Sequence, residues 1–126
     1  MRADFSEPFI TADTPRLRFS SFKAYVTVIT GCNMDCTYCI VPNTRGRERS
    51  RPMRDVLREV SALAGQGYQE ILFLGQTVNA YGDDLAGPGE NFVALLRETD
   101  KLFPAGRVRF LSAHPKKITD DLIDAW

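Results

Sequence analysis

The sequence has no net charge, no long apolar run and little sulfur. Its 126 residues carry 16 basic and 16 acidic side chains, so bulk charge gives no argument for nucleic acid, a membrane surface or an acidic substrate as partner. No apolar stretch approaches the roughly 20 residues that a membrane-spanning helix needs. The first seven residues do not lead into the apolar stretch of a secretory signal. We therefore expect a cytoplasmic protein with no membrane segment.

Cysteine is scarce and occurs in one place. The three cysteines all lie between Cys32 and Cys39, and an odd, tightly clustered set makes a poor disulfide framework. In a reducing compartment the same thiols are available as thiolates for a metal. The rest of the composition is ordinary, with 44% hydrophobic residues, so a hydrophobic core is possible. The length suits one domain.

Three segments have the pattern of a β-strand. Residues 24–30 are rich in β-branched side chains and stop at Gly31. Residues 71–74 form a short continuous apolar run, as expected for a strand buried on both faces. Residues 108–111 are expected to form a third strand. Residues 32–51, after the first strand, read as a polar loop that contains the cysteines.

Helices are predicted after each of these strands. Apolar residues recur at helical spacing over 53–64, with Pro52 at the first helical position, and again over 92–103. Thr119, followed by two acidic residues, has the pattern of a cap that opens a third helix.

This order of elements predicts an α/β fold. Strand and helix alternate three times with short connections, which implies a parallel sheet with right-handed crossover helices. Three strands are few for this class, and two full helices cannot cover both faces of a parallel sheet. We expect residues 23–126 to form the first half of a larger (βα) barrel, and residues 1–22 to be a linker or lead-in.

The cysteines have the spacing Cys-x-x-x-Cys-x-x-Cys, at Cys32, Cys36 and Cys39. They follow a strand directly, and the carboxyl end of a parallel strand is where barrel enzymes place their chemistry. Three thiolates can hold three irons of a cubane cluster, unlike the four-cysteine clusters that only carry electrons. The fourth iron would then be an open, Lewis-acidic position able to bind the amine and carboxylate of a ligand.

A structural zinc site is the alternative interpretation, with His114 as the fourth ligand. Structural zinc sites usually pair their cysteines two by two, whereas this loop has three in sequence. A single histidine followed by Pro115 is more often a loop residue than a ligand. The spacing therefore favours the iron–sulfur cluster.

Two blocks of the sequence resemble the methylthiotransferases of the radical S-adenosylmethionine (SAM) superfamily. The first is residues 31–52, with Tyr38 just before the last cysteine, and the second is residues 74–82. The resemblance runs from about Ala24 to the end of the chain. It implies the N-terminal half of a radical SAM partial (βα) barrel. Within the family it is nearest to the branch that adds a methylthio group to a modified adenosine of tRNA.

The resemblance also implies the cofactors and their contacts. The three cysteines would hold the [4Fe–4S] cluster that cleaves S-adenosylmethionine, and Tyr38 would lie near the adenine of that cofactor. Gly75 and Gln76 occupy the place of the glycine-rich motif that meets the methionine amino group. A plain strand terminator is the alternative interpretation of Gly75.

A basic stretch follows the cysteines, and its interpretation is open. It could contact the cofactor carboxylate or the phosphates of an RNA substrate. Equally, it could be a solvated loop with a salt bridge or two. The stretch consists of Arg45, Arg47, Arg49, Arg51 and Arg54.

Whole enzymes of this family carry an auxiliary-cluster domain and an RNA-binding domain, and we expect neither in this chain. A tRNA substrate and a one-electron donor are the partners implied for the intact enzyme, and we expect the chain alone to be inactive. Two other functions stay open: methylthiolation of a ribosomal-protein aspartate, and a non-catalytic, zinc-stabilised RNA-binding module. The pair Val78–Asn79 mildly favours the tRNA branch.

Overall fold

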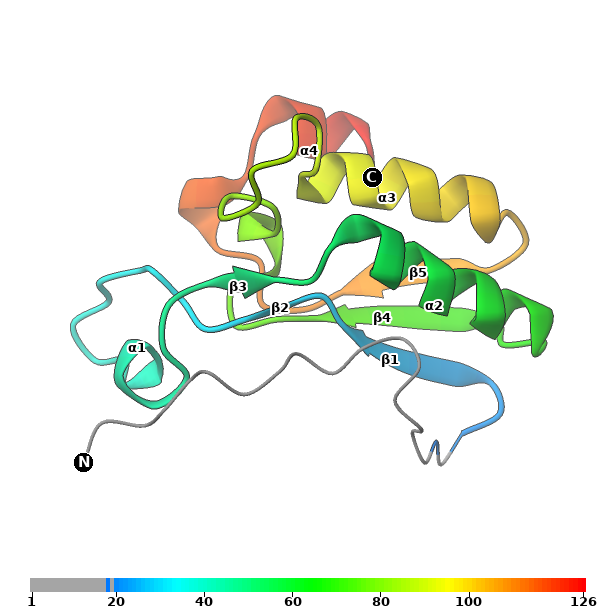
Figure 1. Ribbon diagram of the computed structural model, residues 1–126, viewed down its shortest axis with the longest axis horizontal. Coiled ribbons are helices and arrows are strands. Elements are labelled where there is room, and N and C mark those ends of the chain that lie inside the picture. The colour runs from blue at the N-terminus through cyan, green and yellow to red at the C-terminus, as the bar shows by residue number, and fades with distance from the viewer. Residues whose placement is uncertain (1–17, 19) are drawn as a thin grey trace.

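Three parallel strands form the central sheet of the protein. The structure is a computed structural model that describes residue 18 and residues 20–126. β1 (Lys23–Thr27), β4 (Glu70–Leu74) and β5 (Arg107–Phe110) lie in the order β1–β4–β5, and both pairings are parallel. Helices connect consecutive strands of this sheet (Figure 1). The predicted α/β fold with crossover helices is therefore confirmed.

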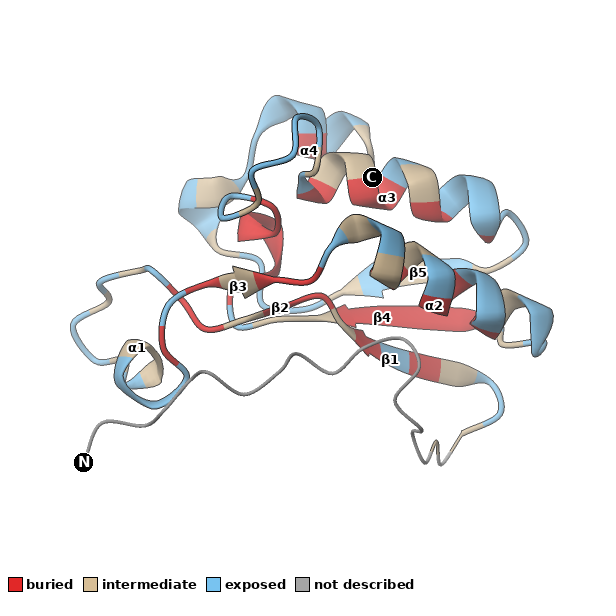
Figure 2. Ribbon diagram, viewed as in Figure 1, coloured by how far each residue is buried: buried red, intermediate tan, exposed pale blue. Residues whose placement is uncertain are grey.

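Two long helices cover one face of the sheet. α2 (Met53–Gly65) follows β1 in the chain and α3 (Phe92–Leu102) follows β4, and the two helices pack on each other and on the sheet. Ala24, Ile71 and Val108 are in register across the three strands and point to this side. Figure 2 shows the buried residues gathered where the helices meet the sheet. Each aliphatic side chain fully buried there contributes about 1.5–3 kcal/mol.

The other face of the sheet has a different character. Tyr25, Leu72 and Arg109 are in register on it, and both Tyr25 and Arg109 are exposed. Since α2 and α3 both lie on the opposite side, neither helix covers this face. In a barrel such a face is the interior. The arrangement agrees with the predicted partial barrel.

The first predicted strand is in fact two strands. β1 pairs with β4, whereas β2 (Ile29–Thr30) pairs with β3 (Arg49–Ser50) in an antiparallel ribbon. Val28 lies at the change of partner: its N–H donates to Leu74 O at 2.9 Å, and its C=O accepts from Arg51 N at 2.8 Å. The prediction of one strand over 24–30 is therefore wrong at Val28.

The predicted polar loop between the first strand and α2 is partly ordered. It contains the short helix α1 (Val41–Thr44) as well as β3. Pro52 is the residue before α2 and has an extended ψ of 134°, so the helix begins at Met53, one residue later than predicted. The predicted end near Gly65 is confirmed.

Three short helices complete the fold: η1 (Val78–Ala80), η2 (Pro115–Lys117) and α4 (Asp120–Asp124). The Thr119 hydroxyl accepts from Leu122 N at 3.2 Å, which confirms the predicted cap of α4. In the described part of the chain, no helix is both long enough and apolar enough to cross a membrane.

A buried charge cluster lies under α2. Val56, Val60 and Leu63 of this helix are buried as the spacing predicts, but Glu59 is buried too. Its carboxylate accepts from Arg51 Nη1 at 2.8 Å and from Arg18 Nη2 at 2.6 Å. Arg18 thus connects the predicted lead-in, residues 1–22, to the core, although most of that segment lies outside the described residues.

Candidate functional site

The cysteine loop begins at Gly31, directly after β2. Gly31 has a φ of 77°, and a β-carbon added there would lie 2.0 Å from Arg47 O. Because both the left-handed backbone and this close approach exclude a side chain, the position needs glycine. Cys32 N then donates to Gly46 O at 3.1 Å. The outgoing and returning arms of the loop therefore lie directly against each other.

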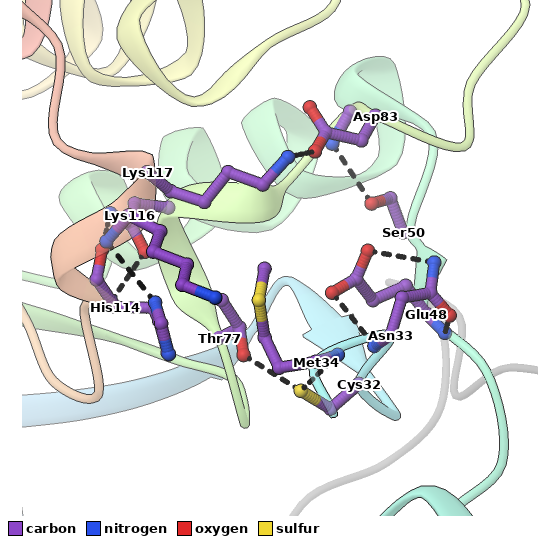
Figure 3. A network of polar contacts seen from close by, with 12 residues as sticks. Cys32, Asn33, Met34, Glu48, Ser50, Thr77, Asp83, His114, Lys116 and Lys117 are labelled. Atoms are coloured by element: carbon purple, nitrogen blue, oxygen red, sulfur yellow. Dashed lines mark hydrogen bonds and ion pairs between the residues drawn. The ribbon is translucent and has the colours of Figure 1, made fainter. Parts of the chain in front are cut away.

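Glu48 and Asn33 join the same two arms. The Glu48 carboxylate accepts from the backbone N–H of Asn33 at 3.1 Å and from its Nδ2 at 3.0 Å, and Glu48 N donates to Asn33 Oδ1 at 3.2 Å. Glu48 is buried, and Figure 3 shows the pair beside Cys32. Both carboxylate oxygens thus hold the residue next to the first cysteine.

The three predicted cluster ligands lie on this loop, at the carboxyl end of the sheet. All are free thiols; Cys32 is buried, and Cys36 and Cys39 are half-buried. Cys39 N donates to Cys36 O at 3.0 Å, so the last two cysteines share a tight turn. Among residue 18 and residues 20–126, no three His, Cys, Asp or Glu side chains converge closely enough to hold a metal ion. The three thiols thus lie on one loop, but their sulfurs do not converge on a common position.

The loop after β4 places Gly75 and Gln76 against the cysteine loop. A β-carbon at Gly75 would lie 2.4 Å from Cγ2 of Ile29, so the glycine allows β4 and β2 to approach closely. Gln76 Oε1 accepts from Gly31 N at 2.7 Å. Both predicted cofactor contacts therefore support the start of the cysteine loop.

Thr77 is a site residue that the sequence pattern did not reveal. Its hydroxyl is fully buried and lies 3.1 Å from Sγ of Cys32, the contact drawn in Figure 3. The signal that could have found it is its position directly after Gly75 and Gln76, on the strand end that faces the cysteines.

His114, the fourth ligand of the zinc interpretation, reaches the cysteine loop from the segment between β5 and η2. Its Nε2 lies 3.9 Å from Sγ of Cys36, and its Nδ1 accepts from Lys116 N at 3.2 Å. A neutral imidazole that accepts at Nδ1 carries its proton on Nε2. That nitrogen faces Cys36 as a donor, with no lone pair for zinc. The contact to Lys116 therefore argues against a zinc site.

Asn79 fixes the backbone of His114. Its Nδ2 donates to His114 O at 3.0 Å, and its Oδ1 accepts from His114 N at 2.8 Å. Asn79 is buried on η1, in the same loop as Thr77. The loop after β4 thus positions the partners of two different cysteines.

Tyr38, the predicted neighbour of the adenine, lies between the second and third cysteines. Its side chain is 92% exposed, which is far more than an aromatic residue used for core packing. The ring is therefore available to stack on a ligand.

The basic stretch divides into one core residue and several surface residues. Arg51 is 1% exposed, and its Nη1 donates both to Glu59 and to Thr27 O at 2.8 Å. A cofactor contact and a solvated position are therefore both wrong for Arg51, because its guanidinium is part of the core. Arg45 and Arg47 are exposed, so both interpretations stay open for them.

A second ion pair lies on the rim of the site. Lys117 of η2 donates to Asp83, in the turn that follows η1 (Figure 3). This hydrogen bond raises the pKa of Lys117 above its usual value. The pair joins the segment that carries His114 to the loop that carries Thr77 and Asn79.

Comparison with protein-family models decides the family. The model described as the radical SAM superfamily matches residues 26–124, a range that includes every site residue described above. The chain belongs to the radical SAM superfamily. In this radical SAM chain the cysteine loop, the loop after β4 and His114 all lie inside the matched domain.

The radical SAM chain is also similar to proteins named tRNA-2-methylthio-N(6)-dimethylallyladenosine synthase. It is 52% identical over 115 residues to that of Pseudothermotoga lettingae, 55% over 108 to that of Acetivibrio thermocellus, and 50% over 119 to that of Clostridium tetani. These alignments cover 91%, 86% and 94% of this chain, but 26%, 22% and 26% of the relatives. The chain thus spans about a quarter of the length of the curated relatives it matches. The predicted resemblance to tRNA methylthiotransferases is confirmed.

Proposed function

We propose that this chain is part of a radical SAM methylthiotransferase that adds a methylthio group to a modified adenosine of tRNA. The observation that carries the proposal is the set of three free thiols on one loop at the carboxyl end of a parallel sheet. The substrate in this proposal is supported by the name of the relatives, which specifies a methylthiolated dimethylallyladenosine of tRNA.

The donor set fits a [4Fe–4S] cluster with one iron left free. Cys32, Cys36 and Cys39 are all the cysteines of the chain, and thiolates are the usual ligands of such clusters. Cys36 and Cys39 are half-buried, so a cluster can reach their sulfurs without opening the core. Met34 N also donates to Sγ of Cys32 at 3.4 Å, a contact suited to a thiolate.

The other predicted site residues have separate tasks in this proposal. Bound together, the cluster and S-adenosylmethionine supply radical chemistry able to attack an inert carbon–hydrogen bond. Tyr38 offers its exposed ring to the adenine. Since the Gln76 side chain is engaged with Gly31, we assign the methionine end of the cofactor to the backbone around Gly75 and Gln76.

We also propose the partners of the whole enzyme. They are tRNA as substrate, a one-electron donor, and the auxiliary-cluster and RNA-binding domains that the family resemblance assigns to the whole protein. The cytoplasm, where thiols stay reduced, is the proposed location.

Anaerobic reconstitution of the chain with iron and sulfide tests the metal site. We expect a brown protein that holds about four irons and whose reduced form gives an EPR signal that changes when S-adenosylmethionine is added. Each of C32A, C36A and C39A should lose the colour. Thr37→Ala, an exposed change on the same loop, is the matched control and should keep it. A colourless chain that binds one zinc would show that the zinc-stabilised module is the correct alternative.

The substrate is tested on the full-length protein that contains this chain. Reconstituted enzyme is incubated with S-adenosylmethionine, a reductant and tRNA bearing dimethylallyladenosine, and the digested nucleosides are analysed by mass spectrometry. We expect the methylthio derivative of that nucleoside. Modification of a ribosomal-protein aspartate, with unchanged tRNA, would contradict the tRNA assignment.

A further inference from the structure

Two of the three cysteine sulfurs have a side-chain hydrogen-bond partner. Thr77 Oγ1 lies 3.1 Å from Sγ of Cys32, and His114 Nε2 lies 3.9 Å from Sγ of Cys36. In the described part of the chain, no side chain makes such a contact to the sulfur of Cys39. The three sulfurs therefore differ in their surroundings.

The direction of both hydrogen bonds follows from chemistry. A thiolate that binds iron has no proton, so the Thr77 hydroxyl must be the donor to Cys32. His114 accepts at Nδ1 from Lys116 N, which leaves the proton on Nε2 and makes this nitrogen the donor to Cys36.

Both donors are held in place by other contacts. Thr77 is 1% exposed, at the start of the turn into η1. His114 is fixed by two backbone hydrogen bonds to Asn79 and by the bond to Lys116. Neither side chain has a polar partner among the described residues that would explain its position without the cysteine, apart from the Lys116 contact that sets the His114 tautomer.

We propose that Thr77 and His114 are positioning residues that tune the cluster through Cys32 and Cys36. Their donors withdraw electron density from the two thiolates and stabilise the reduced, more negative cluster. The reduction potential is therefore higher than it would be without them, and the two corners of the cluster bound to Cys32 and Cys36 differ electronically from the corner bound to Cys39. This inference rests on the proposed function, because it requires that the cysteines hold a cluster.

The test is the reduction potential of the reconstituted chain, measured by redox titration monitored by EPR. Thr77→Val and His114→Leu remove one donor each, and each should shift the potential to a more negative value. The double variant should shift it further. Thr77→Ser and His114→Gln retain a donor and should return the potential towards that of the original chain. Thr44→Val makes the same change at an exposed threonine of α1 whose hydroxyl contacts Ile40 O and Val41 O and no cysteine, so it is the matched control and should leave the potential unchanged.

The outcomes separate this inference from the proposed function. A chain that assembles no cluster overturns both. If the cluster assembles but Thr77→Val and His114→Leu both have the reduction potential of the original chain, the inference alone is overturned. If Thr77→Val folds by circular dichroism yet holds no cluster, recovery in Thr77→Ser supports the role of the hydroxyl, and failure to recover refutes it. If either Thr77→Val or His114→Leu does not fold, the inference is tested on the other donor by the same comparison of reduction potentials.

Discussion

Arg51 is the most deeply buried charged side chain in the described part of the protein, and its partners come from three parts of the chain. The guanidinium lies beside Glu59 of α2 and Thr27 O of β1, and its backbone C=O accepts from Tyr81 Oη at 2.8 Å. A buried ion pair is not in itself strongly stabilising, but removing one partner leaves the other charge buried with less compensation.

Replacing Arg51 by methionine should therefore be costly. We expect Arg51→Met to lower the free energy of unfolding by about 3 kcal/mol, since the buried Glu59 carboxylate loses the guanidinium that lies 2.8 Å from it. Urea denaturation followed by circular dichroism measures this. The matched control is Arg54→Met, whose side chain is 82% exposed and should cost less than about 0.5 kcal/mol. Equal losses in the two variants would contradict a core role for Arg51.

Two glycines with left-handed backbones offer a second comparison at single residues. Gly31→Ala and Gly67→Ala both place a β-carbon on a positive φ, a cost of about 1–2 kcal/mol. At Gly67 nothing lies within 4 Å of the new atom, whereas at Gly31 it would meet Arg47 O at 2.0 Å. We expect Gly31→Ala to be the more destabilising in urea, because the arms of the cysteine loop must separate. A smaller loss at Gly31 than at Gly67 would show that this loop is loosely held.

Residues of the site were predictable only where the chemistry is local in sequence. The spacing of the cysteines predicts one loop after one strand, because three ligands on eight residues are set by short-range geometry. Thr77 and His114 lie 45 and 78 residues from the cysteines that they contact. Such contacts depend on strand order and register, which a single sequence does not specify. The role of Arg51 was ambiguous for the same reason. Its partner Glu59 is a polar residue, so the sequence alone does not assign it to the buried face of its helix.

At the scale of elements, the periodic helices and the buried strand were predicted closely, and the junction at Val28 was not. A run of β-branched residues indicates extended backbone but not the strand with which it pairs. The partner changes at Val28 because its N–H and C=O bond to opposite neighbours, Leu74 and Arg51. This change leads the chain away from the sheet and into the cysteine loop.

Tyr81 connects elements across the core, and its hydroxyl makes the free energy of unfolding vary with pH in the alkaline range. Burial is the main cause that raises the pKa of Tyr81 well above its usual value, with the nearby charge of Glu90 adding to it. Below about pH 10 the hydroxyl keeps its proton in both the folded and the unfolded chain, so it adds no pH dependence. Above that pH the unfolded chain loses the proton while the folded chain retains it. The free energy of unfolding must then fall as pH rises.

Tyr81→Phe should remove this part of the alkaline destabilisation. At neutral pH the variant should lose about 1 kcal/mol, because the hydrogen bond to Arg51 O is gone. Between pH 9 and pH 11 its unfolding free energy should decline less than that of the original chain, measured in urea at each pH. Tyr25→Phe is the control: Tyr25 is 50% exposed, and its removal should leave the decline in place. Identical slopes in all three chains would contradict the assignment to Tyr81.

At the scale of the whole molecule, one carboxylate joins all three strands of the parallel sheet. Glu70 begins the central strand and is only 5% exposed. Lys23 of β1 lies 3.8 Å from its carboxylate, and Arg109 and Arg107 of β5 lie 3.8 and 4.0 Å from it. These cations come from both neighbouring strands on the face that α2 and α3 do not cover. The attraction acts across the sheet, in addition to the backbone pairing of β4 with β1 and with β5.

Glu70→Gln tests how much this attraction contributes to the cohesion of the sheet. The cations are partly exposed, so we expect a loss of about 1 kcal/mol or less at low ionic strength. The loss should shrink near 1 M salt, where the screening length is about 3 Å. Thermal and urea unfolding at both ionic strengths measure it, with Glu98→Gln, which removes an exposed pair within α3, as the matched control at about 0.3 kcal/mol. If the Glu70→Gln chain is at least as stable as the original at low salt, the free-energy cost of burying the carboxylate equals or exceeds its attraction to the three cations.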